Sequence, residues 1–225
     1  MLIVLEGLDG SGKSTQVKML REYLQKVCSR LEYIHFPRYD SPVYGELIGK
    51  FLRGDFGELN QVHPQLVALL YAEDRHGAVP EIRKGLEDGG TVLLDRYVYS
   101  NLAYQCAKMP DRESAEELRE WIINTEFGSF GEPRPDINIF LDVPMGFVQN
   151  SLNHNRQGAD RGYLHGARDI HEADLHFQEK VRAMYLRQAE VDPSLTVIDC
   201  ASGDGAMLPP DAIFEKIKAL IDERI

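Results

Sequence analysis

Residues 7–15 read GLDGSGKST, directly after the apolar run LIVL at residues 2–5. The stretch fits the phosphate-loop pattern GxxxxGK[ST], in which backbone N–H groups converge on phosphate oxygens, the lysine neutralises charge and the hydroxyl reaches Mg²⁺. The segment that follows has apolar residues at helical spacing, and the start of a helix adds positive charge beside the loop. The stretch therefore predicts a strand, a glycine-rich turn and a helix that bind a nucleoside triphosphate with Mg²⁺.

Four further apolar runs have the character of strands, and segments with helical spacing lie between them. The expected strands are residues 31–36, 91–95, 136–143 and 195–199, and the expected helices are about 42–52, 64–87, 113–125, 144–153, 173–190 and 210–222. Because each connection is long enough to hold a helix, the strands are expected to be parallel. The sequence predicts an α/β, three-layer P-loop NTPase fold, with a five-stranded parallel sheet flanked by helices.

Two stretches depart from this regular pattern. Residues 36–60 are rich in Gly, Pro and Asp and predict a loop with one short helix. Residues 153–169 contain few apolar anchors and three arginines, Arg156, Arg161 and Arg168, which predicts a basic lid segment. The sequence has no internal repeat and no linker that would divide it, so residues 1–225 are expected to form a single domain.

Composition limits the classes of partner. The net charge is −11 and the pI about 5.1, so the chain carries too much negative charge to bind long stretches of nucleic-acid backbone. No nucleic acid partner is therefore expected. No apolar run approaches the ~20 residues of a membrane span, and no basic segment precedes the first strand, so no membrane partner and a cytoplasmic protein are expected. The three cysteines are widely spaced and predict neither a disulfide framework nor a zinc site.

A second polar cluster follows the expected strand at residues 91–95. Asp95 ends that strand, where ligands gather in open α/β sheets, and can act on Mg²⁺ directly or through water. Arg96 can bridge the phosphates between which a phosphoryl group moves. A GTPase would show an NKxD-like base reader, absent from residues 136–160, and an ATPase motor would need further domains. A small-molecule kinase is therefore favoured.

The chain resembles the thymidylate kinase family over nearly its whole length. The segments that carry the resemblance are EGLDGSGKSTQ (6–16), FPRYDSP (36–42), AEDRHG (72–77), DRYVYSNLAYQ (95–105), PDINIFLDVP (135–144) and ARDIHE (167–172). The resemblance implies that the γ-phosphoryl group of ATP passes to the 5′-phosphate of dTMP, and that the protein is a homodimer. The third and fourth segments are more discriminating than the phosphate loop.

By this resemblance four sets of site residues are expected. ATP would be bound by Gly7, Leu8, Asp9, Gly10, Ser11, Gly12, Lys13, Ser14 and Thr15. The acceptor dTMP would be bound by Asp9, Phe36, Pro37, Arg38, Tyr71, Arg75, Arg96, Ser100, Asn101 and Tyr104. The catalytic residues would be Lys13, Arg96, Asp9, Arg156 and Arg161, and Mg²⁺ would meet Ser14, Asp95 and Asp9.

Individual acceptor residues also have plainer interpretations. Arg75 lies on an otherwise apolar helix, which makes sense if a buried anion or carboxylate awaits it, although a surface ion pair with Glu73 or Asp74 is the alternative. Tyr71 lies one turn earlier and could stack on thymine or simply fill the core. The Asn101 amide can both donate and accept, as the thymine edge requires.

Three departures from the family pattern are visible. The phosphate loop lacks the arginine that some members carry, which directs the search for another cation to residues 153–169. His171 replaces an aromatic residue common in relatives, and the FPRYD loop lacks an EPGGT-like run. A non-trans Phe36–Pro37 peptide is a further expectation.

Two rival functions stay open at this stage. A deoxynucleoside kinase would share the phosphate loop and the Asp95–Arg96 pair, but its hydroxyl acceptor benefits from a carboxylate base, and Glu6 at the end of the strand could be mistaken for that base. A regulator that senses ATP without turnover could keep the fold and lose the catalytic cations. The arginines retained here favour the kinase of a nucleoside monophosphate.

Overall fold

The structure is a computed structural model that describes residues 1–59, 61–153, 162, 164, 169–172 and 174–224. Its parallel sheet contains β1 (Leu2–Gly7), β2 (Leu31–His35), β3 (Thr91–Asp95), β4 (Ile137–Asp142) and β5 (Leu195–Asp199), in the order β2-β3-β1-β4-β5. The predicted five-stranded parallel sheet is thus confirmed. The arginines expected to form the lid, Arg156, Arg161 and Arg168, lie outside the described residues.

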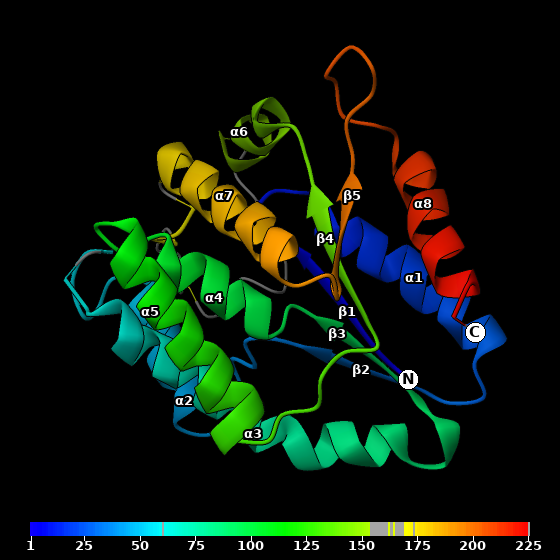
Figure 1. The fold of residues 1–225 in the computed structure, drawn as a ribbon, viewed down its shortest axis with the longest axis horizontal. Helices are drawn as coiled ribbons and strands as arrows, with labels where there is room; N and C mark the ends of the chain where they lie inside the picture. The colour runs from blue at the N-terminus through cyan, green and yellow to red at the C-terminus, as the bar shows by residue number, and fades with distance from the viewer. Residues whose placement is uncertain (60, 154–161, 163, 165–168, 173, 225) are drawn as a thin grey trace.

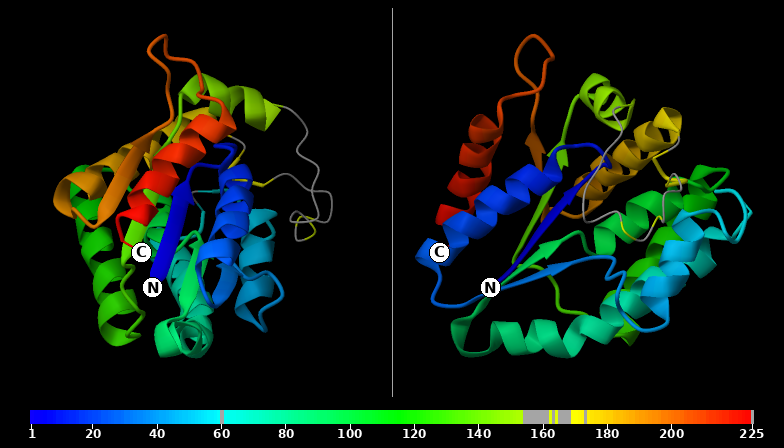
Figure 2. Two further views of the ribbon diagram at one scale, coloured as in Figure 1. Left: turned by 90° about the vertical axis from the view of Figure 1, so that its right-hand side faces the viewer. Right: turned by 180° about the vertical axis from the view of Figure 1, so that it is seen from behind.

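Helices cover both faces of the sheet and make three layers (Figures 1 and 2). The helices are α1 (Lys13–Val27), α2 (Tyr44–Leu52), α3 (Pro64–Leu86), α4 (Val98–Cys106), α5 (Arg112–Ile123), α6 (Met145–Asn153), α7 (Leu175–Val191) and α8 (Pro210–Asp222). The α1 and α8 helices pack together on one face, and α3, α4 and α7 lie on the other. Short 3₁₀ and π turns follow α3 and α5, at Glu87–Gly89 and Asn124–Ser129.

Central strands are buried on both faces, which explains why the sequence shows continuous apolar runs there. Every residue of β1 and β3 is buried. The two strands pair in register, with Leu5 opposite Asp95, so the phosphate loop after β1 and the acidic end of β3 meet at one edge of the sheet.

Helix α4 is the element that the sequence patterns missed. All nine residues of Val98–Cys106 are buried, so the helix has no face exposed to solvent, and the contrast between a buried apolar face and an exposed polar face is absent. The other helices begin and end within a few residues of the expected ranges. The short helix predicted within residues 36–60 is α2, and it packs on α3 around a small separate cluster of Ile48, Phe51, Leu52 and Val67.

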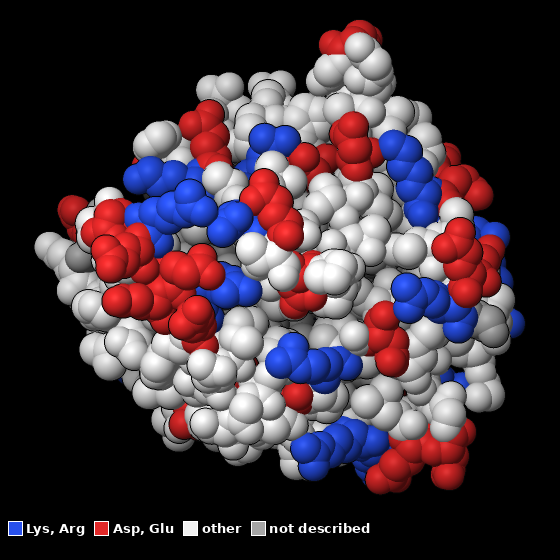
Figure 3. Space-filling model, viewed as in Figure 1, with Lys and Arg blue, Asp and Glu red and all other residues white. Residues whose placement is uncertain are grey.

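The surface carries acidic and basic side chains side by side. On the face drawn in Figure 3, Lys and Arg alternate with Asp and Glu, and no continuous basic surface covers that face. Within the described ranges, no helix combines the length and the apolar character needed to cross a membrane.

Candidate active site

The phosphate loop connects β1 to α1 through two left-handed glycines. Gly10 has a φ of 76° and Gly12 a φ of 77°, a region that favours glycine over other residues. Gly12 is also the residue before α1, so the loop ends at a helix N-terminus that attracts anions. Ser14 and Thr15 are exposed on the first turn of this helix, where their hydroxyl groups are open to a ligand.

Lys13 is buried and forms an ion pair with the Asp95 carboxylate across the edge of the sheet. The second Asp95 oxygen lies 3.0 Å from Nδ1 of His35. Burial alone would raise the pKa of Asp95, but the Lys13 ammonium and His35 outweigh it and hold this pKa below its usual range. Asp95 is therefore ionised at neutral pH and already close to the phosphate loop.

Arg96 has a φ of 69°, a left-handed conformation that is unusual for a residue with a side chain. Its guanidinium donates to the Gly7 carbonyl at 2.8 Å and to Asp9 Oδ1 at 2.7 Å. The other Asp9 oxygen accepts a hydrogen bond of 2.8 Å from the Tyr104 hydroxyl. The strained backbone and these bonds hold the Arg96 guanidinium between the phosphate loop and α4.

Glu6 is fully buried and supports the start of α4. Its carboxylate accepts hydrogen bonds from the backbone N–H groups of Tyr97 and Ser100, at 3.0 and 3.2 Å. The hydroxyl groups of Ser100 and Tyr185 also donate to it. These bonds satisfy N–H groups that the first turn of a helix leaves unpaired, so Glu6 has a structural role and is not free to act as a base.

A pocket opens beside the phosphate loop, between α3, α4 and the loop that follows β2. The residues that line it are Asp9, Phe36, Pro37, Tyr39, Leu52, Tyr71, Arg75, Arg96, Ser100, Asn101, Tyr104, Gln105, Asp169 and His171. All residues expected to bind the acceptor are among them except Arg38. The Phe36–Pro37 peptide is cis, as the sequence suggested.

Arg38 lies away from this pocket, on the outer side of the loop. Its backbone N–H donates to Asp74 Oδ2 at 2.8 Å, and its Nε donates to Asp74 Oδ1 at 3.1 Å. Ser41 Oγ donates to the same carboxylate at 2.7 Å. Buried Asp74 therefore fixes the loop of residues 36–42 to α3, and Arg38 contributes to that attachment.

Arg75 is 2% exposed and pairs with Glu126, which is 0% exposed and comes from the π turn after α5. The guanidinium donates from Nη2 to Glu126 Oε1 at 2.9 Å and from Nε to Oε2. The expectation of a buried carboxylate is met, and the alternative of a surface pair with Glu73 or Asp74 is wrong. A second buried acid, Glu132, has an oxygen 3.9 Å from Arg75 Nε.

His171 closes one side of the pocket among aromatic rings. Its ring centroid lies 5.2 Å from that of Tyr104 and 5.6 Å from that of Phe51. Burial, together with the charges of Lys108 and Arg96, lowers the pKa of His171 well below its usual value, so the imidazole is neutral at pH 7.

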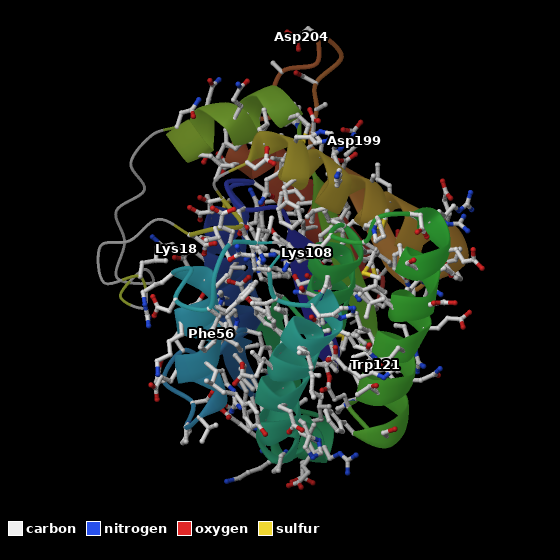
Figure 4. All side chains as sticks on the ribbon, turned by 90° about the vertical axis from the view of Figure 1, so that its left-hand side faces the viewer. Lys18, Phe56, Lys108, Trp121, Asp199 and Asp204 are labelled. Carbon is white, nitrogen blue, oxygen red and sulfur yellow. The ribbon has the colours of Figure 1, made fainter. Side chains whose placement is uncertain are left out.

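Lys108, labelled in Figure 4, follows α4 near the same rings. Its ammonium lies 4.8 Å above the Phe51 ring and donates to Gln105 Oε1 at 2.7 Å. Burial lowers the pKa of Lys108 to about 7. Because this pKa lies near neutral pH, the charge of Lys108 changes when its surroundings change.

Several site residues were missed at the sequence level. Tyr39, Leu52, Gln105 and Asp169 line the pocket without belonging to any predicted set. Gln105 could have been found by continuing the helical spacing from Asn101, because residues four apart share a face. Nothing in the local sequence distinguishes Glu126 from the other acidic residues around α5.

Comparisons with known proteins agree with this arrangement. The family model described as Thymidylate kinase matches residues 5–204. The chain is 34% identical over 190 residues to the thymidylate kinase of Mycobacterium tuberculosis, covering 84% of this chain and 86% of that protein. It is 33% identical over 227 residues to a probable thymidylate kinase of Thermococcus kodakarensis, covering 99% and 97%.

A solved structure gives the same result. The thymidylate kinase of Candida albicans aligns with a TM-score of 0.72 at 25% identity, covering 99% of this chain and 91% of that one. The structural match spans the sheet, its helices and the phosphate loop together. The chain therefore belongs to the thymidylate kinase family.

Proposed function

We propose that this protein transfers the γ-phosphoryl group of ATP to the 5′-phosphate of dTMP and so forms dTDP. The observation that carries the proposal is the position of Arg96. Its guanidinium contacts the phosphate loop through the Gly7 carbonyl and lines the acceptor pocket with Asp9 and Tyr104. A cation placed there can stabilise charge on both the donor and the acceptor phosphates.

Phosphoryl transfer to a phosphate oxygen demands alignment and charge neutralisation more than proton removal, because the acceptor is already ionised near neutral pH. We assign Lys13 to the phosphates of ATP, after it leaves Asp95, and Arg96 to the phosphates on either side of the transferred group. Glu6 is engaged by α4, and this supports a reaction that needs no carboxylate base. An arginine of the lid segment, Arg156 or Arg161, is the proposed further cation.

The donor side fits a magnesium ion carried by ATP. Ser14 offers an exposed hydroxyl on the first turn of α1, and Asp95 offers an ionised carboxylate at the end of β3, with Asp9 as a further oxygen donor. Among the described residues, no cluster of three or more His, Cys, Asp or Glu side chains could hold a metal alone. When bound, Mg²⁺ would neutralise charge on the phosphates of ATP.

The acceptor side fits a pyrimidine deoxynucleotide. Tyr71 lies one helical turn before Arg75 and can stack on the base. The Tyr104 phenol, held by Asp9 at 2.8 Å, stands where it can crowd the sugar's 2′ carbon. Ser100 and Asn101 present polar groups to the pyrimidine edge, and Phe36 and Pro37 line the phosphate end of the pocket.

A coupled assay of ADP release with ATP and Mg²⁺ tests the proposal directly. Parallel reactions receive dTMP, thymidine or buffer, and dTDP is identified by chromatography. We expect turnover with dTMP and none with thymidine. Phosphorylation of thymidine alone would identify a deoxynucleoside kinase, and tight ATP binding without any product would identify a regulator.

We further propose that residues 1–225 act as one catalytic domain and that two copies form a homodimer. Support for the dimer comes from apolar side chains left exposed around α2 and α3, namely Val43 at 62%, Phe56 at 44% and Leu66 at 60% (Figure 4 labels Phe56). Analytical ultracentrifugation of the wild type and of Leu66→Glu tests it, with a monomeric variant expected. A cytoplasmic location is proposed on the sequence and on the three free thiols.

A further inference from the structure

One buried carboxylate, that of Glu126, holds two side chains of the acceptor pocket. Oε1 accepts a hydrogen bond from Arg75 Nη2 at 2.9 Å and another from Asn101 Nδ2 at 2.8 Å. Glu126 itself is 0% exposed and does not line the pocket. It therefore lies behind the residues that meet a ligand and is not positioned to touch one.

The contacts of Asn101 determine which end of its amide is free. Nδ2 donates to Glu126 Oε1 and, at 3.0 Å, to the backbone carbonyl of Ala68. Both partners accept hydrogen bonds only, so the NH₂ group must face them and both of its hydrogens are used. The Oδ1 atom remains; it is buried, and none of the described residues gives it a hydrogen-bond partner. Asn101 thus offers the pocket an acceptor and no donor.

Glu126 also fixes Arg75, and it leaves a donor of that side chain free for a ligand. Its Nε and Nη2 are committed to Glu126, and no described residue accepts a hydrogen bond from Nη1. Since Arg75 lines the pocket, Nη1 is the donor that this residue can offer a ligand. The pocket therefore places one acceptor and one donor on side chains held by the same carboxylate.

We propose that Glu126 is a positioning residue that sets this polarity and thereby selects the base; this rests on the proposed function. Thymine and uracil present N3–H beside the C4 carbonyl, which matches the Asn101 acceptor and the Arg75 donor. Cytosine presents a lone pair at N3 and an amino group at C4, so both contacts would be acceptor to acceptor or donor to donor. Unpaired buried polar groups are what makes such discrimination strong.

The neighbouring acid Glu132 provides a matched control. Burial and the charge of Glu126 raise the pKa of Glu132 to about 9, so it is a neutral acid at pH 7. None of its carboxyl atoms makes a hydrogen bond to Asn101 or Arg75. Glu132→Gln therefore changes a buried acid that interacts with Glu126, while the bonds from Asn101 and Arg75 to Glu126 are kept.

The test compares kcat and KM for dTMP, dCMP and ATP in the wild type, Glu126→Gln and Glu132→Gln. For Glu126→Gln we expect the KM for dTMP to rise about tenfold or more, the KM for ATP to stay within about twofold, and the dTMP-to-dCMP ratio of kcat/KM to fall at least about tenfold. Glu132→Gln should keep that ratio. A merely structural role would lower activity on both nucleotides equally.

Asn101→Ala keeps the Arg75–Glu126 pair and serves if Glu126→Gln does not fold. It should lower the dTMP-to-dCMP ratio as well. An unchanged ratio in the variant that folds, or an equal fall in Glu132→Gln, would overturn the inference. A wild-type protein that does not phosphorylate dTMP would instead defeat the proposed function.

Discussion

Replacing Arg75 by methionine tests how much the buried Arg75–Glu126 ion pair contributes to the stability of the protein. The substitution keeps an unbranched apolar chain but removes the cation from Glu126, which is 0% exposed and would retain its bond to Asn101. Breaking a buried ion pair by removing one partner costs about 3–5 kcal/mol, because the other charge stays buried without compensation. The free energy of unfolding should fall by that amount.

The same loss of stability can be expressed as a fall in melting temperature. For a chain of this size, each kcal/mol lowers the melting temperature by about 2–4 °C, so the loss corresponds to roughly 6–20 °C. The assay is urea unfolding at pH 7 and at fixed protein concentration, followed by circular dichroism. The concentration is fixed because the apparent stability of the proposed dimer would depend on it.

A double variant distinguishes two causes of the lost stability: the missing attraction between Arg75 and Glu126, and the Glu126 charge left buried without a partner. Arg75→Met combined with Glu126→Leu removes both charges, and it should recover at least about half of the lost stability. A loss below about 1 kcal/mol in Arg75→Met would refute the reasoning. So would a double variant that is no more stable than the single one, since the stranded carboxylate would then not be the cause.

Three further predictions concern single residues. Lys13→Ala should lower kcat by about a hundredfold or more while changing the Kd for dTMP little, measured by turnover and calorimetry, and the reverse pattern would contradict its assignment to ATP. Glu132 has a folded pKa of about 9, above the unfolded value of about 4.3, so its stabilising effect is present below pH 4.3 and is lost as pH rises toward 9. Glu132→Gln should therefore gain stability relative to the wild type across that range, and parallel urea midpoints at pH 5, 7 and 9 would show no such trend if the residue were ionised. Lys108, with a pKa of about 7, binds fewer protons folded than unfolded between pH 7 and about 10.4, so the wild type should gain stability relative to Lys108→Met as pH rises through that window.

The donor side of the protein could be predicted from local sequence because its chemistry is local. Gly10, Gly12 and Lys13 lie within one turn, and their conformations follow from the strand before and the helix after them. The strands can also be predicted from the sequence, since burial on both faces produces unbroken apolar runs. Both features are therefore visible within a short stretch of sequence.

The acceptor side depends on contacts between distant segments. The amide orientation of Asn101 is set by Glu126, 25 residues later, and by Ala68, 33 residues earlier. Arg38 matched a family motif but is held by Asp74, 36 residues away. Helix α4 carries three predicted acceptor residues, Ser100, Asn101 and Tyr104, yet it was not predicted as a helix, because none of its faces is exposed to solvent. Such features become predictable only when the packing is known.

Buried Glu6 connects the phosphate loop to the start of α4, so these two parts of the molecule cannot be redesigned independently. Glu6 immediately precedes the phosphate loop, yet it also fixes the first turn of α4, and Arg96 donates to the Gly7 carbonyl from the other direction. Changing Ser100 to admit a different nucleotide would disturb the same carboxylate. Redesign of the accepted base is therefore best begun at Asn101, because its bonds go to Ala68 and Glu126 and not to the phosphate loop.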